Sequence, residues 1–62
     1  MSDQSIAAKL TNADHLRFLD WLDYYEGIEV GFANVLTLIG PEQADYGLAQ
    51  QLLEKWRAWR AN

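Results

Sequence analysis

The sequence predicts an all-α protein: an antiparallel helical hairpin with a short N-terminal helical segment, pairing with a second copy into a dimeric four-helix bundle. Three observations predict this class. The apolar half of the 62 residues is rich in leucine and alanine and has only two valines and three isoleucines, which favours helix over sheet. Apolar residues recur at spacings of three and four, and a single Gly-Pro pair divides the chain. We expect one helical domain over residues 1–62.

The N-terminal segment, residues 3–10, is expected to form a short helix capped by Ser2. A helix this short is not stable alone and has to dock on the remainder of the chain. The apolar side chains that it offers for docking are Ile6, Ala7 and Leu10.

A long helix is expected over residues 12–39. Thr11 is suited to accept hydrogen bonds from N–H groups of the first turn, and Asp14 favours the positive helix N-terminus. Spacings of four and three then mark a heptad-like seam. The seam consists of Phe18, Leu22, Tyr25, Glu29, Phe32, Leu36 and Ile39, with Trp21, Ile28 and Val35 in a column beside it.

Two glycines, Gly27 and Gly31, interrupt this helix, where each costs about 1 kcal/mol relative to alanine. One interpretation is that another helix approaches closely on the glycine face. The other is that the long helix kinks or stops near Gly27 and restarts, which would make three main helices. The sequence leaves both interpretations open.

The C-terminal helix is expected over residues 41–60. Gly40 suits the left-handed position after a helix, and Pro41 suits the first turn of the next one. A hairpin turn centred near residue 40 places Glu26 opposite Lys55. The same register pairs Asp23 with Arg57, Asp20 with Arg60, Tyr25 with Trp56 and Phe32 with Ala49.

Both helices carry wider apolar stripes than one hairpin can bury. The preferred explanation is a second copy of the chain, because a domain of this size buries only about 60% of its unfolded surface. The alternative is a three-helix monomer with the N-terminal segment folded over the apolar edge. The expected contact residues, for self-association or for a partner protein, are Trp21, Tyr24, Leu52, Arg57 and Trp59.

Two polar residues stand out. Glu29 lies within the apolar seam, where a buried carboxylate would act as a general base or fix the register of a dimer. Alternatively the seam opens there and Glu29 reaches solvent or an indole N–H. His15 has no partner at metal-ligand spacing, so we expect it to be exposed near a helix end.

A row of acids, Asp20, Asp23, Glu26 and Glu29, recurs at every third position. Steps of three residues spread this row over about half of the helix circumference. The spread favours a solvated helix with interhelical ion pairs over a cation site. A mimic of nucleic-acid phosphates is the alternative.

Composition excludes several functions. The net charge of −4 argues against direct nucleic-acid binding. The chain has no cysteine, no phosphate-binding loop and no nucleophile–base constellation, so we expect no enzyme activity, no cofactor and no metal. It has no apolar run of the roughly 18 residues that a membrane span requires, and no secretory signal, so we expect a cytoplasmic protein.

The remaining expectation is a small acidic, non-enzymatic protein-binding module that acts as an inhibitor or adaptor of another protein. Compact acidic chains of this size are a common format for antagonists from phages and mobile elements, an analogy of size class alone. The alternatives are a purely structural homodimeric subunit and an acidic mimic that antagonises a nucleic-acid-binding protein.

Overall fold

The computed structural model describes residues 4–61, which fold into three α-helices and one short 3-10 helix, with no strand among them. The 3-10 helix η1 spans Ala7–Lys9, and the α-helices are α1 (Asn12–Glu26), α2 (Val30–Leu38) and α3 (Tyr46–Ala61). The predicted all-helical class is confirmed. No described helix has the length and apolarity needed to cross a bilayer.

The expected long helix is two helices, and the break lies at Gly27. Helix α1 begins as predicted, with the Thr11 hydroxyl accepting a hydrogen bond from the Asp14 amide at 3.1 Å. It ends at Gly27, which has a φ of +67° and so adopts the left-handed conformation that favours glycine. The amides of Gly27 and Ile28 both donate to the Leu22 carbonyl. Of the two interpretations of the glycine pair, the break is correct.

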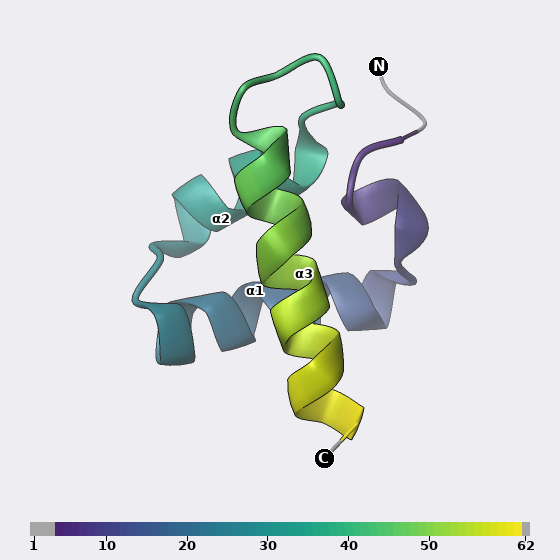
Figure 1. The fold of residues 1–62 in the computed structure, drawn as a ribbon. Helices are drawn as coiled ribbons and strands as arrows, with labels where there is room; N and C mark the ends of the chain where they lie inside the picture. Colours follow the sequence, from purple (N-terminus) through teal and green to yellow (C-terminus); the bar gives the residue numbers. More distant parts are fainter. Residues whose placement is uncertain (1–3, 62) are drawn as a thin grey trace.

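The break changes which helices pair. Helix α2 turns back over α1, so the hairpin-like pair is α1 and α2, and α3 lies across both (Figure 1). The expected hairpin of a continuous 12–39 helix with the C-terminal helix is therefore replaced by a three-helix arrangement. Its pairing into a dimeric bundle involves a second copy and stays a prediction.

Helix α3 begins at Tyr46, later than the predicted residue 41. Two successive turns precede it, with the Gln43 amide donating to the Gly40 carbonyl and the Tyr46 amide donating to the Gln43 carbonyl, both at 3.1 Å. Pro41 takes the second position of the first turn, which its fixed φ also suits. Gly40 is buried and has no positive φ, so its expected left-handed role is wrong.

The N-terminal segment packs on the core, although Ser2 and Asp3, the expected cap and first residue of this helix, lie outside the described residues. Ile6 is fully buried in the main apolar cluster. The Tyr46 hydroxyl donates to the Gln4 carbonyl at 2.6 Å and lies 3.1 Å from the Lys9 ammonium, which donates to it. The segment is thus fastened to the start of α3 by both apolar and polar contacts.

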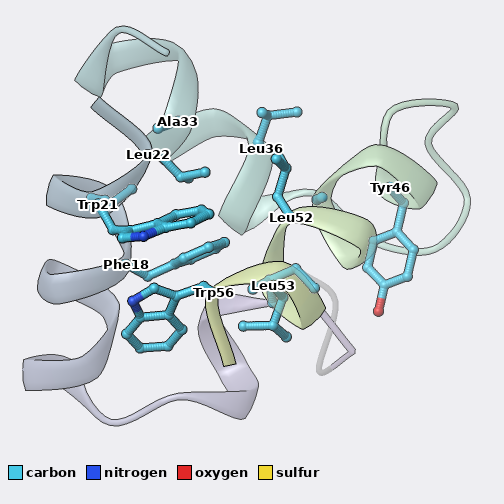
Figure 2. Packing of buried hydrophobic residues seen from close by; sticks show 12 residues of the cluster. Phe18, Trp21, Leu22, Ala33, Leu36, Tyr46, Leu52, Leu53 and Trp56 are labelled. Atoms are coloured by element: carbon cyan, nitrogen blue, oxygen red, sulfur yellow. The ribbon is translucent and has the colours of Figure 1, made fainter. Parts of the chain in front are cut away.

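One apolar core holds the described elements together. The Phe18 ring lies between those of Trp21 and Trp56, with centroid distances of 6.4 Å and 5.1 Å (Figure 2). The buried cluster consists of Ile6, Phe18, Leu19, Trp21, Leu22, Ala33, Leu36, Tyr46, Ala49, Leu52, Leu53 and Trp56.

His15 joins the two ends of the helical pair. Its Nε2 lies 2.8 Å from the hydroxyl of the fully buried Thr37, and that hydroxyl donates to the Asn34 carbonyl at 2.8 Å. His15 is half-buried rather than exposed, contrary to expectation. It serves as a polar tie between the start of α1 and the end of α2.

Candidate functional site

A series of aromatic rings leads from the core to the surface. The buried Trp21 contacts Phe18 on its inner side and Trp59 on its outer side, with a centroid distance of 6.2 Å between the two indoles. Trp59 in turn lies 5.3 Å from Tyr25, which meets Tyr24 edge-on at 4.8 Å. We call Tyr24, Tyr25 and Trp59 the aromatic surface. Tyr24 is 78% exposed and Trp59 is 48% exposed.

A groove of about 380 Å³ lies at the aromatic surface, between α1 and the last turns of α3. The α1 residues that line it are three or four positions apart, so the helical period places them on one side of the helix. The α3 residues follow the same rule. The lining residues are Arg17, Asp20, Trp21, Tyr24, Tyr25, Trp56, Trp59 and Arg60.

The charged side chains at the rim of the groove differ in whether they form ion pairs. Asp14 forms ion pairs with Arg17 at 3.1 Å and with Arg60 at 3.6 Å. Arg60 is also held over the Trp56 ring, 4.6 Å from its centroid. Asp20 forms no ion pair with any residue in 4–61. Its carboxylate is therefore the charged group of the groove lining that has no ion-pair partner there.

Trp21, the inner residue of the groove, carries an unpaired polar atom. Its N–H is buried and has no hydrogen-bond acceptor among the described residues. Leaving a buried donor unpaired costs about 1–3 kcal/mol.

The five predicted contact residues lie in three different places: at the groove, in the core and outside the groove. Tyr24 and Trp59 lie at the groove and are joined through Tyr25, whereas Trp21 is only 5% exposed and forms the inner wall. Leu52 is 7% exposed and belongs to the core, so it is not accessible to a partner. Arg57 is exposed outside the groove, in a shallow depression beside Arg60 and Ala61.

Sequence reasoning missed five residues of the groove: Arg17, Asp20, Tyr25, Trp56 and Arg60. Tyr25 was assigned to the core seam, but the chain turns at Gly27 and leaves its ring half-exposed. The spacing of Arg17, Asp20 and Tyr24 around Trp21 could have identified the α1 side of the groove.

Glu29 is exposed, so it is neither a buried polar residue nor a general base in a cavity. It is the N-cap residue of α2, where a carboxylate interacts favourably with the positive end of the helix. The acidic row is divided as well. Glu26 pairs with Lys55 at 2.9 Å, as the predicted register required, whereas Asp20 and Asp23 are exposed on α1.

Within residues 4–61, no group of three or more histidine, aspartate or glutamate side chains is placed to hold a metal ion. Comparisons of the chain with protein-family models, with curated proteins and with solved structures give no match.

Proposed function

We propose that this chain is a small, non-enzymatic protein-binding module that acts as an inhibitor or adaptor through its aromatic surface. The observation that carries the proposal is the position of Trp59, which is half-exposed while its ring rests on the buried Trp21. The buried core thereby holds a large apolar side chain in place at the surface.

Anchoring of this kind favours binding to another protein. Tryptophan and tyrosine dominate the energetics of protein interfaces because they bury large areas with few rotatable bonds. Trp59 is packed between Trp21 and Tyr25 in the free chain, so it loses little further side-chain freedom when a partner covers it. The groove beside it gives a partner side chain a place to insert.

The chemistry of the groove indicates what the partner presents. Its aromatic walls suit an apolar, aromatic or proline side chain. The unpaired Asp20 suits a cationic group next to that side chain. The net charge of −4 also speeds encounter with a basic surface. The partner surface is therefore apolar at its centre and basic at its edge.

An acidic mimic of nucleic-acid phosphates has less support than this module. Glu26 is engaged by Lys55, and Glu29 lies beyond the turn that ends α1. The two exposed carboxylates that remain on α1, Asp20 and Asp23, do not form an extended acidic strip.

A photo-crosslinking residue placed at position 24 tests the proposal. Tyr24 is exposed at the groove, so a benzophenone side chain there is expected to join the chain to one discrete partner in an extract of the source cells. The matched control places the same residue at Leu16, which is 66% exposed on α1 but does not line the groove. Equal crosslinking from both positions, or none from position 24, contradicts the proposal.

A further inference from the structure

Helix α2 is apolar on the side that faces away from the core as well as on the side that faces it. Val30, Phe32, Val35 and Leu38 are each about half exposed, although α2 has only nine residues. A helix that is apolar on most of its circumference is normally covered on more than one side. Within the described chain, the outer side of α2 is not covered.

Glycine lies at the centre of this outer side. At about 100° per residue, the buried Ala33, Leu36 and Thr37 occupy one arc of the helix, and Gly31 points away from the middle of that arc. Val35 and Leu38 flank Gly31 closely, Val30 and Phe32 lie at the two edges, and the exposed Asn34, between Leu38 and Val30, is the polar residue of this side. We call Val30, Gly31, Phe32, Val35 and Leu38 the outer α2 face.

The space above Gly31 is open. A β-carbon built there would meet only one atom within the range of contact, the Glu29 Oε1 at 4.0 Å. The glycine is therefore not required by any neighbour in the chain, and its φ is not positive. What a glycine at this position does allow is close approach of another backbone or of a bulky side chain.

The distribution of charge along the chain favours a second copy of the chain as the partner of the outer α2 face. Residues 30–41 contain no charged side chain, whereas both α1 and α3 carry several. Two copies of a chain with a net charge of −4 repel each other, and this repulsion is weakest where α2 meets its counterpart. The Glu29 carboxylate lies beside Gly31, and an antiparallel arrangement keeps the two Glu29 side chains at opposite ends of the contact. A basic partner is attracted to the acidic parts instead, and membrane-surface helices carry the lysines and arginines that α2 lacks.

We propose that the outer α2 face is a self-association surface on which a second copy packs its own α2 about a two-fold axis. The two faces are then identical, as a two-fold interface requires. In an antiparallel arrangement centred between Asn34 and Val35, Leu38 of each copy packs over Gly31 of the other. The two Val35 side chains meet near the axis.

The dimer is expected to be weak. Four half-exposed apolar side chains per copy amount to roughly 400 Å², comparable with the largest patch on a typical monomer. Two such faces total roughly 800 Å², below the about 1,000 Å² of buried area that stable specific interfaces reach, so the contact is of the weak, transient kind. This surface shares no residue with the aromatic surface, so the proposal is independent of the proposed function.

Sedimentation equilibrium of the wild-type chain, Gly31→Glu and Gly47→Glu tests the proposal. Gly31 and Gly47 are each the second residue of a helix, each is exposed, and each has open space around it. Both substitutions add the same charge and place a carboxylate in a first turn, where it favours the helix. Circular dichroism confirms that both variants are folded.

We expect the wild-type chain to dimerise with increasing concentration, Gly31→Glu to weaken the dimer at least tenfold, and Gly47→Glu to weaken it less than twofold. A single 7.1 kDa species at every concentration up to about 1 mM overturns the proposal. Equal weakening by both variants also overturns it, because that result reflects net charge rather than the outer α2 face.

Cysteine crosslinking gives a second measurement that does not depend on a charge. The chain has no cysteine, so a disulfide in a single-cysteine variant joins two copies. Val35→Cys is expected to form a covalent dimer under mild oxidation at least five times faster than Leu16→Cys. Leu16 is the matched control because it is more exposed than Val35, at 66% against 55%. Equal rates for the two variants overturn the proposal.

Discussion

The indole rings of Trp21 and Trp59 lie 6.2 Å apart, one buried in α1 and the other half-exposed on α3. This contact extends the core to the surface at the place where the two helices cross. It gives the chain a rigid aromatic side chain next to a groove, with Asp20 as the unpaired charge.

Replacement of the two α3 tryptophans is expected to affect stability very differently. Trp59→Ala removes a half-exposed ring, so we expect it to lower the free energy of unfolding by about 1–2 kcal/mol. Trp56→Ala leaves a cavity beside Phe18 and is expected to cost about 3–5 kcal/mol. Urea denaturation measures both losses, and equal losses would mean that Trp59 belongs to the core.

Removal of the Tyr46 hydroxyl is expected to loosen the N-terminal segment. Tyr46→Phe abolishes the bonds with the Gln4 carbonyl and the Lys9 ammonium and is expected to cost about 1 kcal/mol. Hydrogen exchange should become faster at the Lys9 and Leu10 amides, which close the 3-10 turn. Tyr24→Phe, at an exposed tyrosine, is the control and should change neither quantity.

The left-handed conformation at Gly27 predicts opposite signs for two glycine-to-alanine substitutions. Gly27→Ala places a β-carbon at a φ of +67° and is expected to destabilise the chain by about 1–2 kcal/mol. Gly47→Ala lies in α3 with open space and is expected to stabilise it by about 0.4–1 kcal/mol. Thermal unfolding at low concentration compares them. A stabilising Gly27→Ala would show that α1 continues into α2.

The tautomer of His15 follows from its contact with Thr37. The Thr37 hydroxyl has one hydrogen and donates it to the Asn34 carbonyl, so Nε2 of His15 has to be the donor in their 2.8 Å bond. A long-range ¹⁵N–¹H spectrum of the neutral ring is expected to show the proton on Nε2. Thr37→Val should abolish this preference and cost about 1–2 kcal/mol, because the hydroxyl is buried. A proton on Nδ1 in the wild-type chain would contradict the assignment.

The helical class and the Thr11 cap could be predicted from local patterns. The ion pair of Glu26 with Lys55 was predicted from the register of a hairpin that the structure replaces with three helices. The direction of the chain after Gly27 could not be predicted from local patterns. A heptad-like seam has the same spacing whether the helix continues or stops and turns back, because the period describes faces of a helix and not the path between helices. The turn at Gly27 leaves Phe32 half-exposed, although Leu36 from the same seam is buried.

The candidate site could also be predicted only in part. Tyr24 and Trp59 were expected from their residue types at the edges of their stripes, and both lie at the groove. Leu52 shares an apolar column with Trp59, but its side chain belongs to the buried core (Figure 2). Arg60 and Asp20, which the predicted register brings together, both line the groove, although Arg60 forms its ion pair with Asp14.

The most direct test of the central claim is the affinity of the crosslinked partner for two α3 variants. Trp59 and Leu48 are similarly exposed, at 48% and 45%, but only Trp59 lines the groove. The aromatic surface predicts that Trp59→Ala raises the dissociation constant at least tenfold, whereas Leu48→Ala changes it less than twofold. Equal dissociation constants for the two variants would contradict the claim that the aromatic surface binds the partner.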